Sequence, residues 1–296
     1  VNYLTSATMA LDAGLCDVAL IVYGSNQRTA SGRLVTASRP PAYEAPYNPR
    51  YPISAYAMAA ARHMHEYGTT REQLADVAVA ARAWAQHNPE AFERGPLTRE
   101  DVLGARMVGD PLTVRDCCLV TDGGGAIVMV RADRARDFPK VPVYVLGSAT
   151  ASSHRQISQM KDFTVTAARD SGARAFAAAG VTPADIQAVE LYDAFTINTI
   201  LFLEDLGFCA KGEGGAFVEG GRIAPGGVLP VNTNGGGLSC VHPGMYGIFT
   251  VIEAARQIRG DAPGIQLKDI DLALAHGNGG VLSSQVTAIL GSQNTL

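Results

Sequence analysis

Hydrophobic and polar residues follow one another along this chain with two different periods, which predict its helices and its strands. Apolar residues at helical spacing, supported by capping signals, predict helices at about residues 3–13, 55–67, 71–86, 164–179, 196–206 and 245–259. Short apolar and β-branched runs predict strands at about residues 18–23, 126–130, 143–146, 188–192, 230–233, 272–275 and 284–290. Because helices and strands alternate in the second half, we expect an α/β fold with parallel sheets covered by helices on both faces.

The stretch from Leu229 to Gly247 holds the densest candidate chemistry. A short apolar strand is expected to run into Gly235, Gly236 and Gly237, where the backbone can turn sharply and approach a ligand closely. One histidine and one tyrosine then lie between this turn and the start of a helix, whose exposed N–H groups can hold a developing oxyanion. The residue types indicate a site without naming a reaction, and a glycine-rich hairpin with a buried histidine is an equal alternative.

A charged, proline-flanked segment at Arg131–Lys140 predicts the domain boundary. We expect an N-terminal half at residues 1–138 and a C-terminal half at residues 139–296. Within the first half, residues from about 25 to 110 form an excursion. Its first part, residues 25–51, is rich in Pro, Tyr and Arg, so we expect it to be irregular and to pack on the protein.

Composition and charge exclude several classes of function. The formal net charge of -4 over 296 residues is spread without acidic or basic blocks, which argues against nucleic acid as a partner. No apolar run approaches the roughly 20 residues that a membrane span needs. The five cysteines form no C-x-x-C pair, and no Cys/His spacing suits a metal. We therefore expect a cytoplasmic protein with no metal site.

Two stretches of the chain together resemble a known family. One reads Val189-Glu-Leu-Tyr-Asp-Ala-Phe-Thr196, and the other runs from Asn232-Thr-Asn-Gly-Gly-Gly237 to His242-Pro-Gly-Met-Tyr-Gly247. They are similar to the N-E-A-F or H-D-C-F motif and the N-x-x-G-G…G-H-P-x-G-x-x-G motif of thiolases. Within that superfamily they resemble the branch of the sterol-carrier-protein thiolases and bacterial lipid-transfer proteins.

The resemblance implies a thiolase-like, five-layered α-β-α-β-α fold of two similar halves, usually as a homodimer. It also implies that acyl-CoA thioesters are the substrates and that no other cofactor is needed. In this family a nucleophilic cysteine precedes the helix that corresponds to residues 3–13, which places it about three residues before Val1. We therefore expect the N-terminal part of the first half, with the nucleophile position, to lie outside this sequence.

Three positions depart from the thiolase motifs. The G-H-P histidine is retained as His242, but the C-terminal C-x-G motif reads Ala275-His-Gly-Asn-Gly-Gly280, with no cysteine. His276 could take over acid/base catalysis, since its unperturbed pKa of about 6.5 suits proton transfer near neutrality. A turn histidine that only forms hydrogen bonds is an equal alternative. Tyr192 stands where Asn or His is usual, and Tyr246 stands at a usually small position.

These departures resemble the steroid side-chain-cleaving aldolases of the same branch. Those enzymes cleave a β-hydroxyacyl-CoA by retro-aldol chemistry and form a complex with a small OB-fold acyl-CoA-binding protein. By this resemblance we assign Tyr246 or Tyr192 as the base for the β-hydroxyl, with His242 and His276 near the thioester oxygen or the reprotonation step. Substrate-binding groups are expected from Asn234, Gly235, Gly236, Gly237 and Gly279.

Retro-aldol cleavage of a bulky, steroid side-chain type β-hydroxyacyl-CoA is thus the expected function. One alternative is a thiolase with a cysteine nucleophile upstream of Val1, and another is a non-catalytic thiolase-fold subunit. For each tyrosine the alternative to catalysis is plain packing, at a strand end for Tyr192 and in the first turn of a helix for Tyr246. The steroid preference follows from the resemblance alone.

Overall fold

The computed structural model describes residues 1–30 and 40–296. Its longer helices are α1 (Asn2–Asp12), α3 (Ile53–Tyr67), α4 (Arg71–Ala85), α6 (Ala168–Ala179), α7 (Thr196–Asp205) and α9 (Gly247–Arg259), and its short ones are α2 (Gln27–Ala30), α5 (Arg99–Leu103) and α8 (Gly214–Val218). Each long helix lies where periodicity predicts one. The excursion expected over residues 25–51 falls partly on residues 31–39, outside the described residues.

Capping residues set the ends of several helices. Thr70 accepts a hydrogen bond from the Gln73 N–H and its own N–H donates to the Gln73 side chain, which completes a capping box at the start of α4. Helix α9 ends at Gly260, whose φ of 84° lies in the left-handed region. Local sequence therefore decides where these helices begin and end.

The strands form three sheets. They are β1 (Val18–Ser25), β2 (Met107–Gly109), β3 (Leu112–Thr113), β4 (Gly123–Val130), β5 (Tyr144–Ser152), β6 (Ala188–Leu191), β7 (Leu272–Gly279) and β8 (Ser284–Gly291). The four-stranded sheet has the order β5-β8-β7-β6, while β1 pairs with β4 and β2 with β3.

The prediction of parallel sheets is wrong for most pairs. Among the strands of residues 1–30 and 40–296, β6 and β7 run parallel, whereas β5–β8, β7–β8 and β1–β4 are antiparallel. The connection of β7 to β8 spans only residues 280–283, and so short a link permits an antiparallel hairpin but no crossover. Strand β1 also exposes alternate residues, as antiparallel strands with one open face do.

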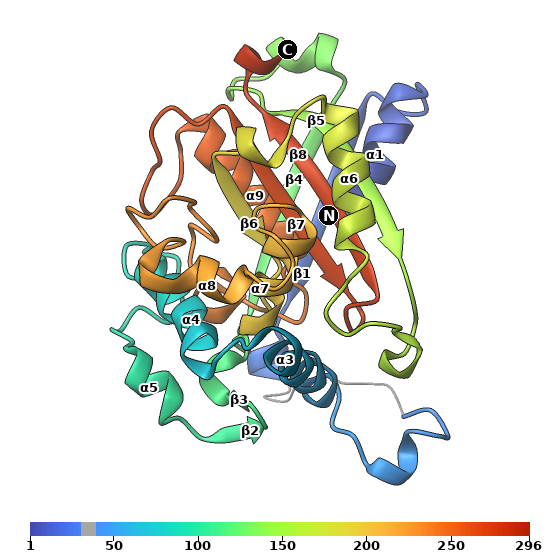
Figure 1. Ribbon diagram of the computed structural model, residues 1–296. Coiled ribbons are helices and arrows are strands. Elements are labelled where there is room, and N and C mark those ends of the chain that lie inside the picture. Colours follow the sequence, from blue (N-terminus) through green and yellow to red (C-terminus); the bar gives the residue numbers. More distant parts are fainter. Residues whose placement is uncertain (31–39) are drawn as a thin grey trace.

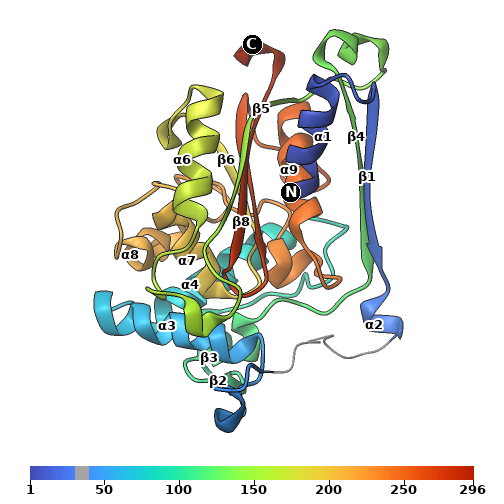
Figure 2. The same cartoon turned by 90° about the vertical axis from the view of Figure 1, so that its right-hand side faces the viewer.

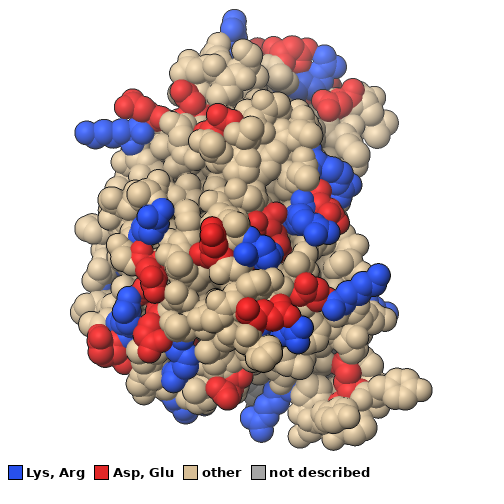
Figure 3. Space-filling view, in the orientation of Figure 1, with Lys and Arg blue, Asp and Glu red and all other residues tan. Residues whose placement is uncertain are grey.

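The layers run from the β1–β4 sheet through α1 and α9 to the four-stranded sheet, with α6 and α7 on its far side (Figures 1 and 2). Helices α3 and α4 lie at the lower end in Figure 1, beside α7. This is a layered α/β fold. Side chains of both charge signs are interspersed over the face shown in Figure 3. Among the described residues, no helix combines the length and the apolar character that crossing a bilayer would require.

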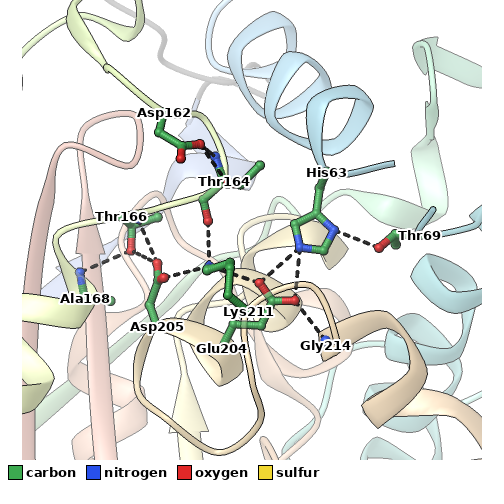
Figure 4. Close-up of polar contacts among 10 residues, drawn as sticks. All are labelled: His63, Thr69, Asp162, Thr164, Thr166, Ala168, Glu204, Asp205, Lys211 and Gly214. Atoms are coloured by element: carbon green, nitrogen blue, oxygen red, sulfur yellow. Dashed lines mark hydrogen bonds and ion pairs between the residues drawn. The ribbon is translucent and has the colours of Figure 1, made fainter. Parts of the chain in front are cut away.

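A charged cluster of His63, Glu204, Asp205 and Lys211 joins α3 to α7 (Figure 4). The Nε2 atom of His63 lies 3.0 Å from Glu204, and Lys211 Nζ lies 3.0 Å from Glu204 and 2.7 Å from Asp205. Burial favours protonation of Glu204, but the His63 hydrogen bond and the nearby Lys211 charge hold its pKa below the ordinary value. The cluster fixes α3 on α7.

The segment around the three glycines differs from the prediction. Residues 230–233 form no strand, and only a single bridge joins Val231 to Val189. Residues Gly236–Cys240 then form one π-helical turn. Gly235 and Gly236 have φ values of 104° and 65°, and a Cβ on Gly236 would overlap the Asp193 carboxylate. Glycine is required here for close approach to protein groups.

Candidate active site

A cavity of about 1200 Å³ lies between the β1–β4 sheet and the end of the four-stranded sheet where β7 meets β8. Its walls come from the start of α1, from β1, from the start of α3, from residues 242–248 and from the β7–β8 hairpin. Most of the lining is apolar. Its polar and thiol groups include those of Tyr56, Cys117, Cys118, Tyr192, His242 and Asn278.

Tyr192 and His242 form a hydrogen-bonded pair in this cavity. Tyr192 follows β6 directly, and its backbone N–H donates to the carbonyl of His276 at 3.0 Å. Its hydroxyl lies 3.1 Å from Nε2 of His242, with the two rings edge to face at 5.6 Å. Tyr192 and His242 are 50 positions apart in the chain, so this hydrogen bond brings together the two motifs, residues 189–196 and 232–247.

Burial decides the protonation of this tyrosine–histidine pair. It lowers the pKa of His242 to about 4, so the imidazole is neutral at neutral pH and one ring nitrogen can accept a proton. Burial also raises the pKa of Tyr192 above its ordinary value. The Nδ1 atom of His242 is buried and has no hydrogen-bond partner among the described residues. The pair can therefore pass a proton between its two members.

Tyr246 does not line the cavity but packs behind Tyr192, which does. It is fully buried immediately before α9, and its hydroxyl donates to Oδ1 of Asn234 at 2.9 Å. Its ring packs edge to face on Tyr192, with the centroids 5.8 Å apart. Of the two tyrosines assigned as the base, Tyr192 lines the cavity and Tyr246 supports it from behind.

The three consecutive glycines and Asn234 also lie outside the cavity lining. Gly235 N–H bonds to the Asn232 carbonyl at 2.8 Å, and Gly236 N–H bonds to Asn234 Oδ1 at 2.7 Å. Gly237 N–H bonds to Asp193 Oδ1 at 2.6 Å. Burial raises the pKa of Asp193 to about 7, against the effect of these backbone donors. In this arrangement the N–H groups bind protein atoms, and their contact with substrate stays a prediction.

Gly279 does line the cavity, together with its neighbours at the end of β7. His276 does not, although it lies on the same strand. The expected turn at 276–280 is wrong, because β7 continues to Gly279 in register with β8. His276 is completely buried between Thr287 and Gln285, each 2.9 Å from one ring nitrogen. This geometry is that of a hydrogen-bonding histidine, and burial lowers its pKa to about 4.

Two cysteines that sequence reasoning left aside also line the cavity, Cys117 and Cys118. Burial raises the pKa of Cys117 to about 12 and that of Cys118 further, so both thiols stay protonated and are weak nucleophiles. Val1 lines the cavity as well, against Gly277. No cluster of three or more His, Cys, Asp or Glu side chains suited to a metal occurs in residues 1–30 or 40–296.

Sequence reasoning missed two polar groups of the cavity, those of Tyr56 and Asn278, and also the Asp193 carboxylate that binds the glycine segment behind it. Tyr56 comes from α3, whose helical periodicity gave no reason to single out one aromatic residue. Asn278 lies within the glycine-rich C-terminal motif, where His276 is the more conspicuous residue. Asp193 directly follows Tyr192 in the first motif, and that position was the one available signal.

Comparison with known proteins shows which family this chain resembles. The profile of the family described as thiolase C-terminal domain-like matches residues 149–292. An acetyl-CoA acetyltransferase of Methanothermobacter thermautotrophicus is 41% identical over 94% of this chain and 73% of the relative. A steroid side-chain-cleaving aldolase of Thermomonospora curvata is 36% identical over 86% of this chain and 68% of the relative.

The structural comparison agrees. The solved structure described as an Ltp2-ChsH2(DUF35) aldolase superimposes with a TM-score of 0.88 at 36% identity, over 98% of this chain and 76% of that one. These relatives are enzymes of the thiolase fold, and so is this protein. The chain belongs to the thiolase family, in the branch that includes the steroid side-chain-cleaving aldolases.

Proposed function

We propose that this enzyme cleaves a β-hydroxyacyl-CoA with a bulky acyl group by a retro-aldol reaction, releasing a ketone or aldehyde and a shortened acyl-CoA. One observation carries the proposal: the Tyr192 hydroxyl lies in a large apolar cavity, hydrogen-bonded at 3.1 Å to a neutral histidine. A phenol in that position can exchange protons with a substrate hydroxyl, and the names of two relatives agree with this chemistry.

The proton path is short. As the substrate β-hydroxyl gives its proton to the Tyr192 oxygen, the Tyr192 proton passes to Nε2 of His242. The electrons of the breaking carbon-carbon bond move to the thioester as an enolate, and the β-carbon becomes a carbonyl. Since burial disfavours the imidazolium, the proton returns readily through Tyr192 to the α-carbon. The products together have the composition of the substrate, so no oxidant or co-reactant is needed.

The enolate oxygen needs hydrogen-bond donors elsewhere on the cavity lining. The end of β7, where Gly279 lies, is the segment that can supply them. Donors held in place before the reaction stabilise negative charge as it develops, and in many enzymes this effect contributes most of the rate enhancement. In this proposal Tyr246 and His276 act behind the cavity wall, and coenzyme A enters as part of the substrate, with no other cofactor.

Cavity size supports a bulky acyl group. Sites of about 300–1,000 Å³ enclose drug-sized ligands, and this cavity of about 1200 Å³ is larger. We propose a steroid-type acyl group on the strength of the relatives' names. The name of the related aldolase structure has two components, so we also propose a partner protein for this chain. The resemblance to the aldolases supports an OB fold for that partner and a homodimeric assembly. The dispersed surface charge supports a cytoplasmic location.

Thiolytic acyl transfer is the second candidate, because a relative at 41% identity is an acetyl-CoA acetyltransferase. It requires a reactive thiolate in the cavity. Burial keeps Cys117 and Cys118 protonated, so this candidate needs the cysteine upstream of Val1 that the thiolase resemblance implies.

Intact-mass analysis with product identification separates the two. The full-length protein, with any partner that copurifies, is incubated in D₂O with a steroid-type β-hydroxyacyl-CoA, and separately with a β-ketoacyl-CoA and free coenzyme A. An aldolase stays unmodified, releases a ketone from the first substrate and leaves one deuteron on the α-carbon of the shortened acyl-CoA. An acyl adduct on a cysteine, with turnover only of the second substrate, would establish a thiolase instead.

A further inference from the structure

A chain of hydrogen bonds runs from the cavity wall into the four-stranded sheet. Asn278 Nδ2 donates to the Tyr56 hydroxyl at 2.8 Å, and Gln285 Nε2 donates to Asn278 Oδ1 at 2.9 Å. Gln285 Oε1 lies 2.9 Å from His276 Nε2, and Thr287 Oγ1 lies 2.9 Å from His276 Nδ1. Asn278 is half-buried and lines the cavity, while His276 and Gln285 are completely buried.

This network has one consistent polarity. Because the Gln285 amide nitrogen faces Asn278, its oxygen faces His276 and must accept a hydrogen bond, so His276 carries its proton on Nε2. Burial lowers the pKa of His276 to about 4 and keeps the ring neutral, so Nδ1 accepts from the Thr287 hydroxyl.

The polarity fixes how Asn278 faces the cavity. Its oxygen accepts from Gln285 at 2.9 Å and one of its two N–H hydrogens is donated to Tyr56 at 2.8 Å, so two contacts hold the amide in this orientation. An asparagine amide nitrogen carries a second hydrogen. On the cavity wall that hydrogen is available to an oxygen atom of a bound ligand.

Tyr56 is itself held firmly in place. It is almost completely buried and stacks on Phe195 with the ring centroids 4.3 Å apart, and its hydroxyl also lies 3.5 Å from the Gly280 carbonyl. Phe195 immediately precedes α7, and the charged cluster fixes α3 against that helix. Asn278 is thus anchored from both sides before any substrate binds.

We propose that Asn278 is a further catalytic residue of this site: its amide donates a hydrogen bond to the thioester oxygen of the substrate, which carries the negative charge of the enolate. His276 is a positioning residue, which acts through Gln285 by fixing the direction of the Asn278 amide. The inference rests on the proposed function only in that the cavity holds an acyl-CoA thioester, and it applies to the aldolase and to the thiolase candidate alike.

Two matched ligands test the contact. One is a saturated steroid-type acyl-CoA thioester without the β-hydroxyl, and the other is the thioether analogue in which CH₂ replaces the carbonyl. The wild-type full-length protein, with its partner, should bind the thioester about tenfold more tightly, as one buried hydrogen bond provides. Asn278→Leu should bind both ligands equally. The thioether affinity is an internal control for the shape of the site, since it does not use the hydrogen bond.

A second variant, Asn278→Asp, can be tested if Asn278→Leu does not fold. Asn278→Asp has nearly the same shape, keeps the acceptor for Gln285 and loses both N–H donors, so it too should lose the preference for the thioester. If the preference persists in the variant that folds, the proposed contact is absent and the inference falls. If the wild-type protein binds neither ligand, the proposed function falls with it, so the two failures are distinguishable.

Turnover variants test the positioning role of His276. Asn278→Leu should lower kcat about 10²-fold or more with a smaller change in KM, the loss expected for one oxyanion donor. His276→Leu should lower kcat by about tenfold and reduce the thioester preference. His276→Gln keeps a donor near the position of Nε2 and should restore both. Equal losses in His276→Leu and His276→Gln, or losses in kcat with an unchanged ligand preference, would show a purely structural histidine.

Discussion

The two buried polar clusters of this molecule treat ionisable groups in opposite ways. In the charged cluster, Glu204 and Asp205 both lie against Lys211, and Glu204 also meets His63. In the tyrosine–histidine pair, Tyr192 and His242 are both neutral, and Nδ1 of His242 has no partner among the described residues. In the first cluster one lysine lies between two carboxylates, and these contacts fix two helices. The second leaves a proton free to move, which is what a general acid–base site requires.

Tyr192→Phe should have the largest effect, because it removes the hydroxyl that touches both the cavity and His242. We expect kcat for retro-aldol cleavage to fall about 10²- to 10⁴-fold, the usual contribution of a positioned acid–base group. Steady-state kinetics on the full-length enzyme measures this. The matched control is Tyr3→Phe, a tyrosine at the cavity that is 71% exposed and should keep its activity. Full turnover by Tyr192→Phe would remove the basis of the proposed mechanism.

Lys211→Met tests the other side of the comparison. It leaves Glu204 and Asp205 buried without their lysine partner, so the free energy of unfolding should fall by about 3 kcal/mol or more. Urea denaturation measures this loss, while kcat per folded molecule at low temperature should stay within twofold. Lys140→Met is the control, since its ion pair with Asp261 is 3.6 Å long and exposed. A large fall in kcat without loss of stability would place the charged cluster in the catalytic machinery.

The sequence predicts the tyrosine–histidine pair better than the charged cluster, for a physical reason. Tyr192 and His242 stand beside a strand end and a glycine turn, which are local features of the chain. His63 and Glu204 lie 141 positions apart within ordinary helices, and nothing in either segment indicates the other. The same limit applies to His276, because the glycines after it read as a turn until pairing with β8 extends the strand to Gly279.

Whether strands pair parallel or antiparallel could not be predicted from the sequence for a similar reason. Residues 18–23 are continuously apolar, so their periodicity cannot show that alternate side chains of β1 are exposed. The direction of the pair depends on its partner strand, β4, and the local sequence of β1 does not indicate which strand will pair with it. Helix ends, by contrast, depend on residues within one turn of the chain, as the capping box of Thr70 and Gln73 shows.

His276→Gln separates burial from catalysis, because His276 is neutral and buried like His242 but lies away from the cavity. Its pKa falls from 6.5 to about 4 on folding, so below pH 6.5 the unfolded chain binds the proton first and stability decreases. At about 1.4 kcal/mol per pKa unit, this costs about 2 kcal/mol between pH 7 and pH 5. Urea titrations at both pH values should show that loss in the wild type and a smaller one in the variant. Identical pH dependence would mean that this imidazole is protonated in the folded protein.

Tyr246→Phe should have the smallest effect and decides which phenol is the base. Its hydroxyl is fully buried and donates to Asn234, behind the ring of Tyr192, so its removal loosens the support of Tyr192 without removing a group from the cavity. We expect kcat to fall about tenfold or less, since one buried hydrogen bond is worth about 1 kcal/mol. Measured beside Tyr192→Phe on the same substrate, a larger loss in Tyr246→Phe would reverse the two roles. It would also mean that the wall between Tyr246 and the cavity opens when substrate binds.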